Sequence, residues 1–115
     1  MSSVLSDLGN LHIFTAIVAA DGASMTTNDG SASIATVGDG TFTITWGTAF
    51  LAAPTVVATC VDAYSKDTTG VCNASITSLS TTALVLQAAH GGDAGADGAA
   101  VDAIIHVIAI GARNI

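Results

Sequence analysis

The apolar run near the end of the chain, residues 102–111, is the feature that most restricts the fold. Successive side chains of a β-strand point to opposite faces of its sheet, so a strand covered on one side only alternates apolar and polar residues. In this run both sets are apolar, with Ile104, Ile108 and Ile110 on one face and Ile105, Val107 and Ala109 on the other. The β-branched residues favour a strand over a short buried helix. We therefore expect a strand that needs cover on both faces.

Similar short strand patterns recur along the chain, with turn residues between them. The clearest is residues 41–46, where Phe42, Ile44 and Trp46 alternate with three threonines, which predicts a half-buried strand with its aromatic face inward. We predict further strands at residues 11–20, 34–37, 55–61, 71–77, 82–89 and 102–111, and turns over residues 25–33. Strands spaced about 10 to 15 residues apart, without any sustained helical period, are typical of sandwiches and barrels. The pattern predicts an all-β fold, a small antiparallel β-sandwich of six to seven strands.

Charged side chains are scarce in this chain. They make up 10% of its 115 residues, against roughly 25% in an ordinary globular domain. The basic residues are Lys66 and Arg113, and all nine acidic residues are Asp, four of them in Asp-Gly pairs that mark turns. With a net charge of −7, the chain has almost nothing to replace the counterions of a phosphate backbone. We therefore do not expect nucleic acid as a partner.

The uncharged runs do not predict a membrane segment. Each is interrupted by polar residues, Gly or Pro, and none resembles the roughly 20 continuous apolar residues of a spanning helix. The N-terminus lacks the basic region of a secretory signal, so we expect synthesis in a cytoplasm without membrane insertion. So little charge on a single domain is better explained by an apolar exterior that neighbouring subunits cover. We predict a homo-oligomer.

Residues 38–111 contain an ordered series of motifs. They are Gly40-Thr41-Phe42-Thr43-Ile44-Thr45, Phe50, Ala53-Pro54-Thr55-Val56-Val57-Ala58, Asn73-Ala74-Ser75-Ile76, Thr81-Thr82 and Val107-Ile108-Ala109-Ile110-Gly111. This series resembles the H-type lectin domain, which implies a six-stranded antiparallel sandwich that assembles as a trimer. Residues 1–37 lie outside the resemblance, so we divide the single compact domain into an N-terminal arm with the first strands (1–37) and a lectin-like sandwich (38–115).

Short lectin-like domains of this kind also resemble structural proteins of bacterial viruses. The resemblance and the scarcity of charge together imply a non-enzymatic virion protein. Its expected form is a homotrimeric capsid decoration (cement) protein of a phage, assembled in the host cytoplasm and attached to a capsid or fibre with help from residues 1–20. The alternative is a carbohydrate-binding receptor-recognition module of a tail or head fibre, in which Asp62, Tyr64 and Lys66 contact a cell-surface glycan. One Trp and one Tyr leave few aromatic platforms for a sugar.

The last strand is the predicted subunit interface, through Ile105, His106, Val107 and Ala109. His106 has two interpretations. On a strand buried on both faces, it is a neutral histidine hydrogen-bonded within the core. Near a three-fold axis, three copies would approach one another, and their protonation would weaken the assembly in acid.

The two cysteines also have two interpretations. Cys60 and Cys72 lie symmetrically about Lys66, so an antiparallel hairpin would bring them within disulfide range. The alternative is a pair of small apolar thiols that stay reduced in a cytoplasm.

No motif predicts catalysis or a metal centre. The loop at residues 91–98 contains two carboxylates and suggests calcium, but it lacks the ligand density of an EF-hand, and Asp-rich turns are ordinary. The three histidines have no metal-ligand spacing, and no nucleophile elbow is present. We predict no catalytic residues, no cofactor and no metal ligands.

Overall fold

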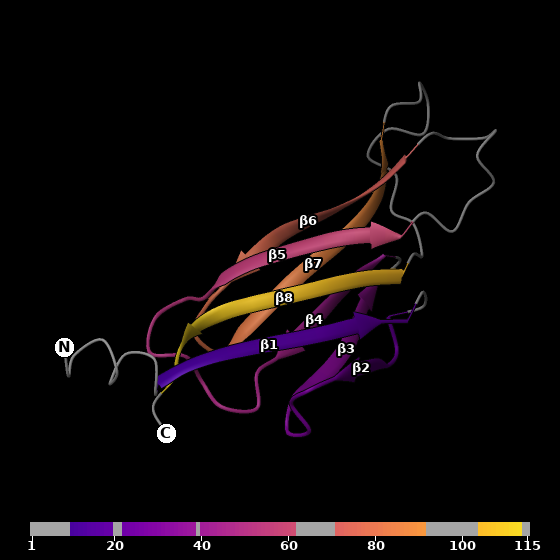
Figure 1. The fold of residues 1–115 in the computed structure, drawn as a ribbon. Coiled ribbons are helices and arrows are strands. Elements are labelled where there is room, and N and C mark those ends of the chain that lie inside the picture. The colour runs from indigo at the N-terminus through magenta and orange to yellow at the C-terminus, as the bar shows by residue number, and fades with distance from the viewer. Residues whose placement is uncertain (1–9, 20–21, 39, 62–70, 92–103, 114–115) are drawn as a thin grey trace.

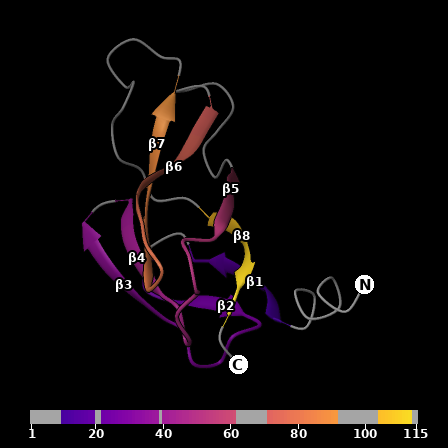
Figure 2. The same cartoon turned by 90° about the vertical axis from the view of Figure 1, so that its left-hand side faces the viewer.

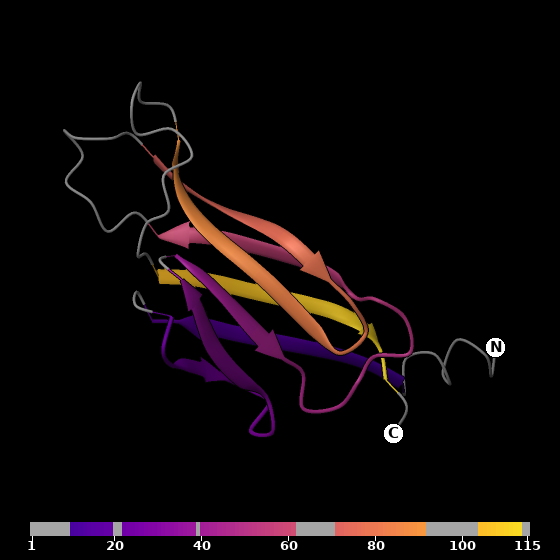
Figure 3. The same ribbon diagram turned by 180° about the vertical axis from the view of Figure 1, so that it is seen from behind.

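The computed structural model describes residues 10–19, 22–38, 40–61, 71–91 and 104–113. These residues form eight strands and no helix: β1 (Leu11–Val18), β2 (Met25–Thr27), β3 (Ser33–Gly38), β4 (Thr41–Thr45), β5 (Thr55–Val61), β6 (Val71–Leu79), β7 (Ala83–Gly91) and β8 (Ile104–Ala112). Two four-stranded antiparallel sheets pack as a sandwich: sheet A, with the order β2-β1-β8-β5, and sheet B, with the order β3-β4-β7-β6. Figure 1 views sheet A from outside, Figure 2 shows the two layers edge-on, and Figure 3 views the molecule from the side of sheet B. The predicted all-β antiparallel sandwich is confirmed, with eight described strands instead of six or seven.

Sheet A is built around β8, the doubly apolar strand. It pairs antiparallel with β1 on one side and with β5 on the other. Ile105, Val107 and Ala109 point inward and are buried in the core, next to the inward residues of β1. Ile108 and Ile110 alternate with them and are exposed on the outer face. One apolar face of β8 is therefore covered by sheet B and the other is open.

Sheet B confirms the predicted aromatic alternation. Phe42 and Ile44 of β4 lie opposite Leu86 and Leu84 of β7, and all four side chains are buried. The threonines of β4 take the other face, as the period of two requires. The two sheets thus contribute the interleaved aliphatic and aromatic side chains of one core.

Aromatic rings close one end of the sandwich. Trp46 follows β4, and its ring packs edge-on against Phe14 at 5.0 Å and Phe50 at 5.3 Å between ring centroids. A Cβ atom on Gly111 would lie 2.8 Å from Cδ1 of Phe50, so this position of β8 has no room for a side chain. At the same end the backbone N–H of Arg113 donates to the carbonyl of Asn10, so the described chain ends meet.

The strands expected at residues 11–20 and 34–37 are present as β1, which lies inside sheet A, and β3, which pairs with β4. Two expectations about the connections need correction. The turn-rich region 25–33 also contains β2 (Met25–Thr27), which three residues are too few to reveal through periodicity. β5 and β6 do not form a hairpin, because β5 is an edge of sheet A and β6 is an edge of sheet B.

Candidate interaction face

The outer face of sheet A carries a patch of exposed aliphatic side chains, which we call the apolar face. Its members, each between 42% and 57% exposed, are Leu11, Ile13, Ile17, Val57, Val61, Ile108 and Ile110. They are seven of the ten large apolar residues exposed in the described part of the chain. A contiguous apolar patch on a protein surface marks an interaction site. The apolar face is therefore the candidate functional site.

The strand register makes this patch continuous. Ile110 of β8 lies opposite Ile13 of β1, and Ile108 lies opposite Val57 of β5. Side chains directly opposite one another on a sheet face are about 4.5–5.5 Å apart at Cβ, so these pairs are close neighbours on the face. His106 is exposed on the same face, between Ile17 of β1 and Thr59 of β5. The patch thus runs across β1, β8 and β5 with one imidazole in it.

The face is hollowed on the side of β2. A shallow groove of about 490 Å³ runs along the outer side of β1, lined by Thr15, Ile17, Thr26, Asn28, His106 and Ile108, among others. A second hollow of about 270 Å³, which shares Ile17 and Thr26 with the first, includes Met25 and Ile104 in its lining. The described lining of both hollows has no charged side chain. The groove therefore offers shape and apolar contact, with hydroxyl, amide and imidazole groups but no fixed charge.

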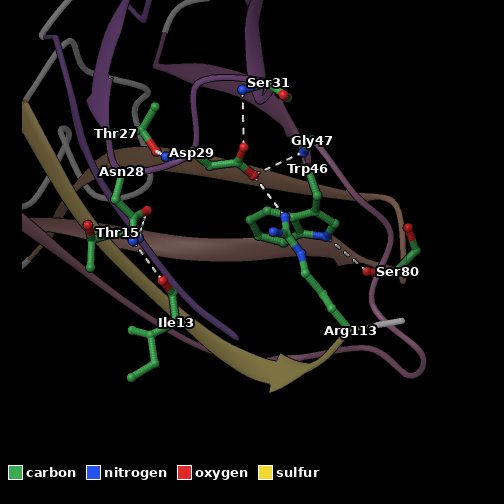
Figure 4. Close-up of polar contacts among 10 residues, drawn as sticks. All are labelled: Ile13, Thr15, Thr27, Asn28, Asp29, Ser31, Trp46, Gly47, Ser80 and Arg113. Atoms are coloured by element: carbon green, nitrogen blue, oxygen red, sulfur yellow. Dashed lines mark hydrogen bonds and ion pairs between the residues drawn. The ribbon is translucent and has the colours of Figure 1, made fainter. Parts of the chain in front are cut away.

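Asn28 closes the edge of β1 next to the groove (Figure 4). Its Oδ1 accepts a hydrogen bond from the backbone N–H of Thr15 at 2.9 Å, and its Nδ2 donates to the carbonyl of Ile13 at 2.7 Å. The side-chain amide thus makes the hydrogen bonds to the backbone of β1 that a neighbouring strand would make, beyond the residues of β1 that pair with β2. Since an open edge invites another strand to pair, this cap favours contact through the face of sheet A over pairing at that edge.

The outer face of sheet B has a different composition. Thr41, Thr43 and Thr45 of β4 lie opposite Gln87, Val85 and Ala83 of β7. The four-stranded architecture is the same, but the outward positions of the central strand β4 are threonines, whereas those of the central strand β8 include Ile108 and Ile110. The patch is therefore a property of one face and not of the fold.

Of the four predicted interface residues, the structure brings only His106 to the surface. Ile105, Val107 and Ala109 are at most 1% exposed and pack between the two sheets. This placement corrects their assignment to a subunit interface, because a side chain inside the core has no surface left for a neighbour. It also corrects the interpretation of His106 as a core residue. The open side of β8 carries Ile108 and Ile110 instead, and a period of two could not show which set faces outward.

Several predicted residues lie outside the described part. Asp62, Tyr64 and Lys66, and all but the first residue of the 91–98 loop, belong to this group, so the sugar contacts and the calcium alternative stay predictions. Cys60 is disulfide-bonded and packs at the margin of the core. The side chain of Cys72 is not among those described, so its pairing with Cys60 also stays a prediction. Within the described ranges, no group of three or more His, Cys, Asp or Glu side chains is placed to hold a metal ion.

An ion pair that the sequence did not reveal joins distant segments. Arg113 donates from one terminal guanidinium nitrogen to Oδ2 of Asp29 at 2.8 Å, and both side chains are nearly buried. The backbone N–H groups of Ser31 and Gly47 also donate to the Asp29 carboxylate. A Cβ atom on Gly47 would lie 2.6 Å from Oδ1 of Asp29, so glycine makes this approach feasible. Asp29 and Arg113 are the only Asp, Glu, Lys or Arg residues of the described ranges, and they neutralise each other.

Titration in this cluster follows from burial and pairing. Burial by itself raises the pKa of Asp29, but the hydrogen bonds from Arg113, Ser31 and Gly47 outweigh it and hold this pKa below its ordinary value of 3.8. His12 packs beside Phe50, with 5.9 Å between ring centroids. Burial, with help from the positive charge of Arg113, lowers the pKa of His12 below 6.5, although Asp29 opposes this shift. The ion pair and the hydrogen bonds to Asp29 make this cluster a structural lock, whereas Nε2 of His12 and Nε of Arg113 are buried without a hydrogen-bond partner among the described residues.

Comparison with protein-family models, curated proteins and solved structures finds no match for this chain. No helix in the described ranges is long and apolar enough to cross a membrane. The functional assignment therefore depends on the residues themselves.

Proposed function

We propose that this chain is a non-enzymatic structural protein that functions as a homotrimer. In its most specific form, the proposal is a capsid decoration (cement) protein of a phage virion, built on an H-type lectin-like sandwich. The observation that carries the proposal is the apolar face, a row of exposed isoleucines and valines across β1, β8 and β5.

The apolar face supports an assembly role because of what its side chains can do. Aliphatic side chains stabilise an assembly when their surface is removed from water, and they neither transfer protons nor polarise a substrate. In the described part of the chain, the only Asp, Glu, Lys or Arg side chains are Asp29 and Arg113, which are paired with each other in the lock. A surface of this kind gains free energy by burial against another apolar surface.

The virion part of the proposal rests on the series of motifs between residues 38 and 111. Its strands β4 to β8 include both central strands of sheet B and the central β8 of sheet A. A decoration protein must present one surface to its own copies and another to the shell. The contrast between an apolar outer face on sheet A and a hydroxyl-rich outer face on sheet B meets that requirement.

The molar mass in solution tests this proposal. Light scattering coupled to gel filtration is expected to give a single species near three times the chain mass of 11.2 kDa. A monodisperse monomer at micromolar concentration would remove the main support for an assembly role. A glycan array tests the competing lectin function: binding that disappears in Tyr64→Ala would replace the structural proposal, whereas silence combined with binding to assembled capsids supports it.

A further inference from the structure

We infer that the apolar face of sheet A is the surface through which copies of this chain contact one another, with His106 near the centre of the contact. This inference rests on the proposed homotrimer and assigns its contact surface and its pH dependence. Ile105, Val107 and Ala109 of β8 lie in the core, so the outward residues Ile108 and Ile110 take their place in the proposed contact.

The chemistry of the face selects a partner that is itself uncharged and aliphatic. Interfacial binding to an anionic membrane uses Lys and Arg with Trp or Phe, and the apolar face has none of these residues. A partner recognised through charge needs complementary charges, which the face also lacks. An identical face supplies the required surface, and two such faces bring no like charges together despite the net charge of −7. The occupant is therefore a second copy of this chain.

The size of the face suits this occupant. Eight residue pairs join β1 to β8, which gives a length of about 26 Å, and three strands give a width of about 14 Å. The projected area, about 370 Å², is roughly half of the 800 Å² per partner that a stable interface buries. The apolar face thus supplies about half of the area that a specific contact between copies needs, and β2 and the rim of the sheet lie next to it.

The width of sheet A also suits three copies. Four strands span about 19 Å, and a triangle with sides of about 19 Å has its centre about 5.5 Å from each side. Packed sheets lie about 10 Å apart, so each fills about 5 Å with side chains. Three copies of sheet A therefore enclose a prism that their outward side chains can fill. β1 and β8 are the middle strands and would line its axis.

This arrangement brings three His106 side chains towards the axis. The groups that face His106 in its own copy are Ile17 of β1, Thr59 of β5, and Ile104 and Ile108 of β8. No described residue of β1, β2, β5 or β8 presents a carboxylate to this face. Charging three imidazoles in a partly dry space, with no described carboxylate on this face to balance them, opposes assembly. Acid therefore dissociates the trimer, and neutral pH favours it.

A matched pair of variants tests the face. Val57 on β5 and Val37 on β3 are exposed valines, at 57% and 67%, on edge strands of sheets A and B respectively. Val57→Asp places a charge in the proposed contact and is expected to raise the trimer dissociation constant roughly 100-fold or more, whereas Val37→Asp leaves the mass unchanged. The emission of Trp46, the only tryptophan, checks that each variant is folded.

The outcomes separate this inference from the proposed function. If the wild type is a trimer and Val57→Asp remains one at the same concentrations, the inference fails and the proposed function stands. Dissociation by Val37→Asp but not by Val57→Asp would place the contact on sheet B. A monomeric wild type overturns both.

The pH dependence is tested with His106→Gln. The wild-type trimer is expected to dissociate as the pH falls from 8 to 5 while Trp46 emission stays native, and His106→Gln is expected to remain trimeric over that range. His12→Gln is the control, because His12 lies on the inner side of β1 and its replacement should leave the acid dissociation in place. A wild-type trimer with unchanged mass at pH 5 would overturn the central position of His106.

Discussion

The outer faces of the two sheets differ although the sheets themselves are alike. Each sheet has four antiparallel strands, and each buries its inner face in the same core. On sheet A the outward positions of the central strand β8 include Ile108 and Ile110, whereas on sheet B those of β4 are threonines. The core that stabilises the fold is built from the inner faces alone. The composition of each outer face therefore reflects the surroundings that this face has after folding.

The largest expected effect comes from the inner side of β8. Val107→Asp would place a carboxylate in the core, at a site 1% exposed, and we expect a loss of more than about 4 kcal/mol in the free energy of unfolding. Ile108→Asp, one residue along the chain, should fold as a protomer. Thermal unfolding followed by circular dichroism measures both. If the two variants were equally stable, the assignment of inner and outer faces would be mistaken.

The next largest effect is expected from a triple variant that places threonines on the outer face of sheet A, as β4 has on the outer face of sheet B. Replacement of Ile13, Ile108 and Ile110 by threonine keeps the β-branched shape and removes the apolar contact. We expect a folded monomer whose unfolding free energy falls by no more than about 1–2 kcal/mol, because these side chains are already partly in water. Sedimentation velocity measures the mass. The same oligomer as the wild type would show that the apolar face is not the contact.

A smaller effect belongs to the lock between Asp29 and Arg113, which should hold the fold without affecting the contact. Asp29→Asn weakens a charge-assisted hydrogen bond, and we expect a loss of about 1–3 kcal/mol at pH 7 in chemical denaturation, with unchanged protomer association. Because folding holds the pKa of Asp29 below 3.8, its contribution is present above that pH and disappears as the pH falls below it. The variant should therefore lose less stability than the wild type between pH 4 and pH 2. An identical acid profile would contradict this account.

The smallest effect is expected on sheet B. Thr43→Ile adds one apolar side chain to its outer face and should change the free energy of unfolding by no more than about 0.5 kcal/mol. Light scattering should give the wild-type mass. New, larger assemblies in this variant would mean that sheet B lies closer to self-association than its hydroxyl groups suggest.

The sequence predicted the positions of the strands better than it predicted which side of each strand faces the core. The alternation at residues 41–46 and the run at 55–61 coincide with β4 and β5 because period-two patterns mark strands directly. The doubly apolar nature of β8 was also predictable, but its outward side was not, since both sets of residues fit a core equally well. The signal for the apolar face was present in β1, where Leu11, Ile13 and Ile17 share one parity.

The contact between Asp29 and Arg113 left no trace in the sequence. Asp29 and Arg113 are 84 positions apart, and Asp29 precedes a glycine, which indicated only a turn. Symmetry of Cys60 and Cys72 about Lys66 suggested a hairpin, yet the intervening segment connects edges of different sheets. Spacing along a chain predicts local pairs, whereas the order of strands in two layers depends on how the whole core packs.

The hydrogen bond between Asn10 and Arg113 makes the described chain nearly a closed ring. Strand order in the sandwich then depends little on where the polypeptide starts. A short peptide linker could join these two positions, and a circularly permuted chain with its break in a surface loop should rebuild both sheets. A peptide fused at either of these two positions would emerge from the same end of the sandwich.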